Sequence, residues 1–118
     1  MNWKILGDEI DLDLLLKESF IKPQIIFKHS TRCSISAMAK GRLDRFEPGQ
    51  SVVFHYLDIL KNRPLSNSIA EKLNVHHESP QVLVIKEGEC IYAPSHWEIE
   101  PKDIIESLES EAWFISND

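Results

Sequence analysis

Four segments of the chain carry apolar residues at helical spacing. In an α-helix, residues three and four positions apart share one face, so this spacing marks a face that packs against a core. The segments are residues 8–20, residues 33–46, the stretch from Pro64 and the stretch from Pro101. Their apolar positions are Ile10, Leu14 and Leu15, then Ile35, Met38, Ala39, Leu43 and Phe46, then Leu65, Ile69, Ala70 and Leu73, and last Ile104, Ile105, Leu108 and Ala112. We therefore predict four helices, the last two with proline in the first turn.

Four shorter apolar runs predict β-strands. Residues 24–29 and 52–58 are apolar on both faces, which is typical of interior strands in a parallel sheet. Residues 82–86 and 90–93 flank Glu87-Gly88-Glu89, a tight-turn sequence that predicts a hairpin. Strands that alternate with helices, followed by a late hairpin, predict an α/β fold with a mixed four-stranded sheet flanked by helices.

Composition favours one domain that spans residues 1–118. A chain of 118 residues that is 42% hydrophobic can bury enough surface for a single core. The first residues, with Asp8 and Glu9 close behind, are too acidic for a signal peptide, and no apolar run reaches the roughly 20 residues of a membrane helix. We expect a cytoplasmic protein without a membrane partner, in which Cys33 and Cys90 stay reduced.

Charge is distributed unevenly along the chain. The net charge of -6 argues against nucleic acid as a partner. Between Ile21 and Arg45, however, six basic residues stand against one acidic residue, a local net charge of +5. One interpretation is a solvated helix face whose late Lys and Arg residues suit the helix dipole. The other, stronger for Arg32 because it adjoins Cys33, is an electrostatic role at the thiol.

Cys33 lies at the predicted junction of a strand and a helix. At a helix start, unsatisfied backbone N–H groups and the positive end of the dipole stabilise a thiolate. Arg32 and His29 add positive charge nearby, although His29 fits equally well as a satisfied histidine at a strand end. One turn later, the Ser36 hydroxyl either donates to the sulfur or replaces a second thiol without touching it. The remaining interpretation is that Cys33 is an inert buried thiol.

Three motifs carry a resemblance to a known family. They are His29-Ser30-Thr31-Arg32-Cys33-Ser34-Ile35-Ser36, His77-Glu78-Ser79-Pro80-Gln81-Val82 and Ser95-His96-Trp97. Together they resemble the YtxJ-type monothiol bacilliredoxins over nearly the whole chain. The resemblance implies a thioredoxin-like fold and an enzyme, a monothiol disulfide oxidoreductase that removes bacillithiol from mixed disulfides on proteins. No tightly bound cofactor is implied, and bacillithiol or a similar low-molecular-weight thiol is the co-substrate.

The resemblance also implies that Cys33 is the nucleophile. The residues around it, Arg32, Ser34 and Ser36, are expected from their positions to stabilise its thiolate. Pro80 is the implied cis-proline, and together with Thr31 and the backbone of Ser79 it would bind the substrate. Family members often have proline directly after the cysteine, whereas this chain has Ser34, which adds a hydroxyl near the sulfur.

Several alternatives remain open at this point. The chain can be a non-catalytic thioredoxin-fold adaptor or stress protein with Cys33 as a regulatory thiol, or the thiol can be glutathione or coenzyme A. Cys90, in a predicted edge strand, is interpreted as packing. None of the five histidines has metal-ligand spacing, so we expect no metal site, and four glycines form no phosphate-binding loop. His77-Glu78 is expected to shape the loop before Pro80.

Overall fold

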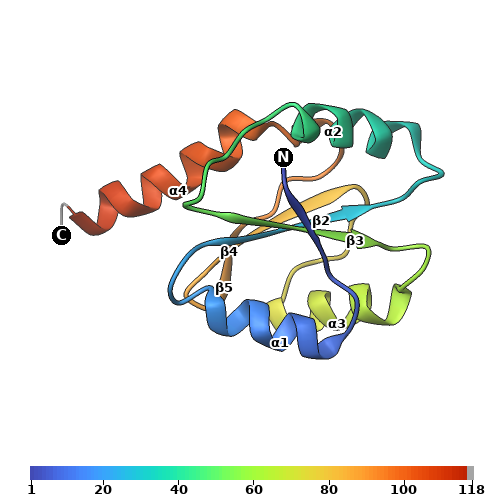
Figure 1. Ribbon diagram of the computed structural model, residues 1–118, viewed down its shortest axis with the longest axis horizontal. Coiled ribbons are helices and arrows are strands. Elements are labelled where there is room, and N and C mark those ends of the chain that lie inside the picture. The colour runs from blue at the N-terminus through green and yellow to red at the C-terminus, as the bar shows by residue number, and fades with distance from the viewer. Residues whose placement is uncertain (117–118) are drawn as a thin grey trace.

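A single mixed sheet organises the protein (Figure 1). The computed structural model describes the backbone of residues 1–116 and the side chains of residues 1–109. The strands are β1 (Trp3–Ile5), β2 (Gln24–His29), β3 (Val53–Asp58), β4 (Gln81–Lys86) and β5 (Glu89–Tyr92). The helices are α1 (Glu9–Glu18), α2 (Ser34–Asp44), α3 (Arg63–Leu73) and α4 (Pro101–Ser116), with a short 3₁₀ turn at His96–Glu98.

The sheet has the order β1-β3-β2-β4-β5. β1, β3 and β2 are parallel, while β4 runs antiparallel to both β2 and β5. The α/β class and the mixed sheet are therefore as expected, but the sheet has five strands instead of four. The additional strand, β1, has only three residues at the sheet edge. Three residues are too few to show an alternating pattern in sequence, and the strand is recognised only by its pairing with β3.

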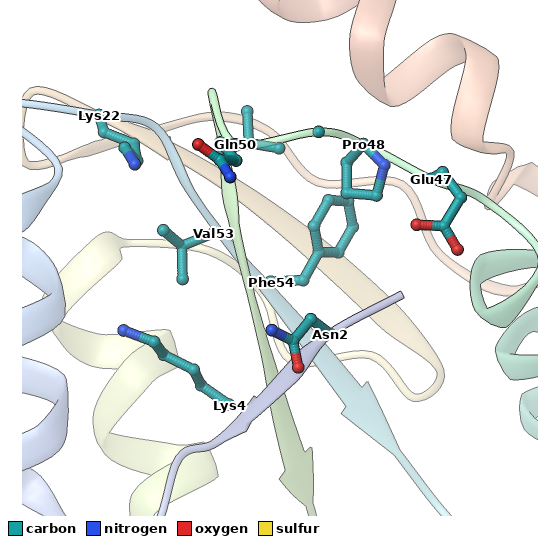
Figure 2. Close-up of a pocket in the computed structure, with 10 residues that line it drawn as sticks. Asn2, Lys4, Lys22, Glu47, Pro48, Gln50, Val53 and Phe54 are labelled. Atoms are coloured by element: carbon teal, nitrogen blue, oxygen red, sulfur yellow. The ribbon is translucent and has the colours of Figure 1, made fainter.

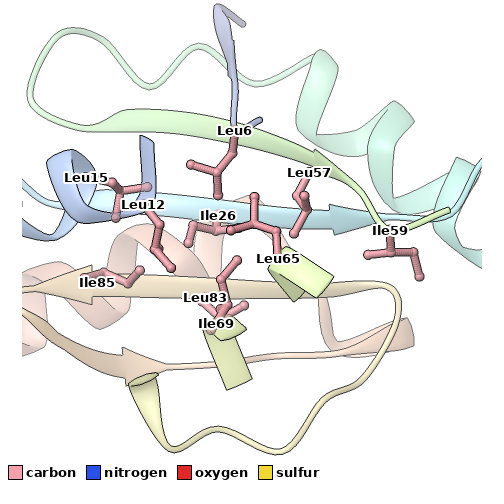
Figure 3. Close-up of a cluster of buried hydrophobic side chains, with 10 residues drawn as sticks. All are labelled: Leu6, Leu12, Leu15, Ile26, Leu57, Ile59, Leu65, Ile69, Leu83 and Ile85. Atoms are coloured by element: carbon pink, nitrogen blue, oxygen red, sulfur yellow. The ribbon is translucent and has the colours of Figure 1, made fainter. Parts of the chain in front are cut away.

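Helices cover both faces of the sheet, α1 and α3 on one and α2 and α4 on the other (Figure 1). Alternate strand residues supply the two cores: Ile26 and Leu83 face α1 and α3, and Phe27 and Val82 face α2 and α4. Figure 3 shows the first core, whose buried members are Leu6, Leu12, Leu15, Ile26, Leu57, Ile59, Leu65, Ile69, Leu83 and Ile85.

Helix α1 differs from the expected orientation. Leu12 and Leu15 are buried, whereas Ile10 and Leu14 are 69% and 52% exposed. Leu12 and Leu15 lie three residues apart and form the stripe that packs on the sheet, so Ile10 and Leu14 fall on a neighbouring face. Ala112, expected to face inward from α4, lies outside the described side chains.

The carboxyl end of β2 is where the chain's candidate chemistry gathers. His29 ends β2, and Cys33 precedes α2 by one residue. Lys28 of β2 is paired with Gln81 at the start of β4, which places the loop before β4 beside this end of β2. Within residues 1–116, no helix combines the length and the apolar character needed to cross a membrane.

Candidate functional site

Cys33 is the N-cap residue of α2, as the strand-to-helix pattern predicts. Its backbone is extended, with φ −107° and ψ 121°, and its N–H donates to Ser30 O at 3.2 Å. No side-chain hydrogen bond caps the helix, and its first turn has no acidic residue. The thiol is half-buried and free. Uncapped amides and the positive helix end therefore adjoin a sulfur that solvent can reach.

Ser36 lies one turn into α2 and is completely buried. Its Oγ is 2.6 Å from Nδ1 of His29, and it accepts a hydrogen bond from the N–H of Ser30 at 3.0 Å. The expected hydrogen bond to the Cys33 sulfur is not among the contacts of Ser36, because His29 and Ser30 occupy its hydroxyl. The structure thus favours the other possibility, a hydroxyl in the place of a second thiol without contact to the first.

His29 is enclosed at the end of β2. The side chain is 4% exposed, and its ring lies 5.4 Å from Phe27 and 5.6 Å from Tyr56, centroid to centroid. Burial lowers the pKa of His29, and the nearby charge of Lys40 lowers it further, whereas Asp58 and Asp44 act in the opposite direction. A neutral imidazole at physiological pH follows from this setting.

The basic residues between positions 21 and 45 do not form one positive patch. Lys28 is completely buried, because β2 is the central strand and helices cover both of its faces. Lys40 pairs with Asp44 at 2.7 Å, and Arg42 lies 3.5 Å from Glu100. Arg32, by contrast, is exposed and forms no ion pair within the described part of the chain. The basic residue next to Cys33 in the chain is therefore Arg32, and it is exposed like the neighbouring Thr31 and Ser34.

The loop before β4 is held by side chains from three elements. Its Ser79-Pro80 peptide bond is cis, as expected. Gln81 donates from Nε2 to His76 O at 3.1 Å and accepts from the N–H of Glu78 at 3.4 Å. The Oγ of Ser79 is buried without a hydrogen-bond partner, the only such side-chain atom among the described residues.

His77 ties this loop to β2 and α3. Its Nδ1 lies 3.2 Å from Nζ of Lys28 and 3.2 Å from Oγ of Ser66. The expected contribution of His77 to the shape of the loop is thereby confirmed. The burial of Lys28, on which that contact depends, was not expected, because lysine is almost never fully buried.

His96 is a residue of this site to which no role was assigned in advance. Its N–H donates to Pro80 O at 3.0 Å, and its φ of 53° lies in the left-handed region that few residues other than glycine adopt. Its Nε2 lies 4.0 Å from a carboxylate oxygen of Glu78. The motif Ser95-His96-Trp97 marks this position in the sequence, but it does not predict a left-handed backbone at His96.

A hollow adjoins the nucleophile loop through Thr31. It has a volume of about 420 Å³, and its lining includes Tyr56, Asp58, Lys61 and Asn62 at the carboxyl end of β3. A second cavity, of about 510 Å³, lies at the opposite end of the sheet, where Lys22 and Phe54 line it (Figure 2). That cavity is at the amino end of β3, whereas the hollow beside Thr31 lies at its carboxyl end, two residues before Cys33 in the chain.

Cys90 is separate from this arrangement. It lies on β5, packs against the core under α1 and α3, and donates from Sγ to Tyr92 O at 3.5 Å. Burial raises the pKa of the Cys90 thiol. Its interpretation as a packing residue is confirmed by these contacts. Across the described residues, no group of three or more His, Cys, Asp or Glu side chains is arranged to hold a metal ion.

Comparison with known proteins agrees with this geometry. Residues 4–104 match the sequence profile of the monothiol bacilliredoxin BrxC family. A solved structure described as having a thioredoxin fold is 29% identical, with a TM-score of 0.80 over 90% of this chain and 93% of that chain.

Two thioredoxins show the same fold at lower identity. Thioredoxin from Malassezia sympodialis is 12% identical, with a TM-score of 0.70 over 92% of this chain and 90% of its own. Spinach chloroplast thioredoxin f is 16% identical, with a TM-score of 0.68 over 92% and 91% of the two chains. The chain has the thioredoxin fold with a thiol redox function, and it belongs to the monothiol bacilliredoxin family.

Proposed function

We propose that Cys33 removes bacillithiol, or a similar low-molecular-weight thiol, from mixed disulfides on cytoplasmic proteins. The observation that carries the proposal is a half-buried free thiol at the amino end of α2 whose counterpart one turn later is the hydroxyl of Ser36. Without a second thiol at that position, the motif cannot close an internal disulfide. A single sulfur that exchanges with external partners is what remains.

The proposed reaction is two successive thiol-disulfide exchanges. The Cys33 thiolate attacks the low-molecular-weight sulfur of the mixed disulfide; its S–S bond breaks, and the protein thiolate leaves and takes up a proton. Cys33 then carries the small thiol. A second molecule of a low-molecular-weight thiol, the reductant, attacks that small sulfur as a thiolate. The products are a low-molecular-weight disulfide and the free thiolate of Cys33.

The setting of Cys33 suits the second exchange in particular. A positive environment stabilises the departing thiolate, and a better leaving thiolate departs faster. In attack, the same stabilisation helps little, since a gain in thiolate fraction is largely offset by lower nucleophilicity. The amino end of α2 adjoins this sulfur, and Arg32 precedes Cys33 in the chain. We therefore assign Arg32 mainly to regeneration.

The hollow beside Thr31 supplies a site for the rest of the small thiol. Its lining combines the apolar side chains of Leu6 and Leu57 with the polar groups of Lys61 and Asn62. Lys61 is exposed and has no ion pair among the described residues, so its ammonium can meet a carboxylate of the co-substrate. Thr31 lines this hollow, while the backbone of Ser79, at the cis-proline loop, is assigned to the polypeptide part of the substrate.

Trapping experiments test the proposal and identify the thiol. The protein is incubated with one target protein that carries bacillithiol, glutathione or coenzyme A in separate reactions, and intact mass shows what Cys33 retains. We expect an adduct of one bacillithiol, absent from C33S and present in C90S. Preferential retention of glutathione or coenzyme A would change the assigned thiol. If none of the three is retained, the protein is instead a non-catalytic adaptor with Cys33 as a regulatory thiol.

A further inference from the structure

The hydrogen bonds of Ser36 have a defined direction. The side chain is 0% exposed, and Oγ contacts Nδ1 of His29 at 2.6 Å and the backbone nitrogen of Ser30 at 3.0 Å. A backbone N–H can only donate, so Oγ accepts from Ser30. The hydroxyl proton then has one acceptor among the described contacts, the Nδ1 of His29. Donation of this proton to Nδ1 corresponds to the tautomer of His29 that carries its own proton on Nε2.

The burial of His29 favours a neutral ring, and only a neutral ring can present a lone pair at Nδ1. At 4% exposure the imidazole is favoured in its neutral form, and a lowered pKa is the consequence. A neutral ring with the proton on Nε2 presents a lone pair at Nδ1, which is what the Ser36 hydroxyl needs. The Ser36 hydroxyl then donates its one proton to His29 and has none left to donate to the sulfur.

These contacts connect the two ends of the nucleophile loop. His29 is the last residue of β2, Ser30 begins the loop, and Ser36 belongs to the first turn of α2. The N–H of Cys33 in turn donates to the carbonyl of Ser30 at 3.2 Å, so both backbone polar groups of Ser30 are fixed. We propose that Ser36 is a positioning residue, whose hydroxyl joins β2 to α2 and so holds Cys33 in place, instead of donating to the sulfur.

This proposal rests on the proposed function, because the rate of the exchange reaction depends on the position of Cys33. Loss of the hydroxyl leaves the Ser30 N–H and His29 Nδ1 unpaired in the interior, so the loop that carries Cys33 shifts to recover partners. Misplacement by about 1 Å costs on the order of 100-fold in rate. If the Ser36 hydroxyl instead donated to the sulfur, its removal would raise the proton affinity of the Cys33 thiol.

Ser19 provides a matched control. It is 2% exposed, donates from Oγ to the carbonyl of Leu16, and accepts from the N–H of Gly88 at 2.9 Å. Like Ser36, it therefore uses one donor and one acceptor in a buried site. It lies between α1 and β2, at the opposite end of the sheet from Cys33. S19A and S36A remove equivalent hydroxyls, and only one of them adjoins the nucleophile loop.

Two rates are measured for the wild type, S36A and S19A. The first is exchange with a thiolated protein, and the second is alkylation of Cys33 by iodoacetamide as a function of pH, in a C90S background. We expect S36A to slow exchange 10- to 100-fold while the midpoint of its alkylation profile stays at the wild-type pH. S19A is expected to match the wild type in both. An alkylation midpoint displaced to higher pH in S36A, or exchange at the wild-type rate, would overturn the proposal.

A spectroscopic measurement keeps the test independent of activity. Two-dimensional ¹H–¹⁵N spectra of the imidazole rings report which nitrogen of His29 carries the proton, with H29N used for assignment. We expect the Nε2–H tautomer in the wild type and slow solvent exchange of the Ser30 amide, which becomes fast in S36A. A proton on Nδ1, or an unprotected Ser30 amide in the wild type, contradicts the inference. The two wild-type readouts, the His29 tautomer and the protection of the Ser30 amide, stand even if the wild type fails to exchange with any mixed disulfide, or if S36A does not fold.

Discussion

Replacement of Lys28 by methionine is expected to stabilise the protein in a pH-dependent manner. Lys28 is 0% exposed on β2, and its Nζ has one described hydrogen-bond contact, Nδ1 of His77 at 3.2 Å, with no carboxylate in ion-pair distance among the described residues. Burial is the main reason that the pKa of Lys28 is lowered from 10.5 to about 8, and the charge of Arg63 adds to it. A charged lysine in this place therefore opposes folding.

The magnitude follows from the two pKa values. The unfolded chain keeps the proton up to pH 10.5, whereas the folded protein releases it near pH 8, so stability rises with pH between these values. Below pH 8 the cost is almost complete, about 3 kcal/mol at pH 7, and it falls to about 1.5 kcal/mol at pH 9.5. The wild type should thus gain about 2 kcal/mol relative to K28M over this range.

Urea unfolding followed by tryptophan fluorescence measures the difference. K28M is compared with the wild type at pH 7 and pH 9.5, which cancels the titration of the tyrosines common to both proteins. Both carry C90S, because the charge of Cys90 is coupled to that of Lys28. The lost contact with His77 is a constant offset, since Ser66 still reaches Nδ1 of that ring at 3.2 Å. K17M, at an exposed lysine of α1, should show no such change with pH. A difference between K28M and wild type that is the same at both pH values would refute the reasoning.

Three further outcomes are expected. R32Q should slow release of the small thiol from Cys33 about threefold, because the leaving thiolate loses a neighbouring charge, and R45Q should not. Rapid quenching separates this regeneration step from the initial attack on the mixed disulfide. Selective slowing of the attack would contradict the assignment of Arg32. K61Q should raise the KM for the anionic low-molecular-weight thiol and leave kcat unchanged in steady-state assays, whereas an unchanged KM removes Lys61 from the site. C90A should retain full exchange activity and lose about 1 kcal/mol in urea unfolding, and an inactive C90A would assign that thiol a chemical role.

Much of the fold could be predicted from local pattern. Helical spacing located α2 and α3, and the apolar run Ile25-Ile26-Phe27 located β2, because periodicity reflects which side chains face a core. The same approach placed Cys33 at a helix start. It did not detect β1, which is defined by partners 51 residues away along the chain, such as Phe54 opposite Trp3. Nor did it identify which face of α1 packs on the sheet, since leucine or isoleucine residues occur on more than one face of that helix.

The candidate site was only partly predictable. Cys33 stands out as a cysteine at a helix start and Pro80 through the family resemblance, and both lie at the carboxyl end of β2 as expected. The partner of Ser36 could not be found by helical spacing, because His29 is seven residues away in a strand. The burial of Lys28 was missed for a related reason: its contact with His77 joins positions 49 residues apart, and only the paired strands bring them together.

The stoichiometry of a single turnover tests the central claim most directly. The protein, with all other thiols excluded, is mixed with an equimolar amount of a bacillithiol-modified protein, and both the released protein thiol and the intact mass of the enzyme are measured. We expect one thiol released per enzyme molecule and an enzyme mass increased by one bacillithiol on Cys33. Release of the thiol together with an internal Cys33–Cys90 disulfide, or equal release by C33S, would contradict a monothiol exchange at Cys33.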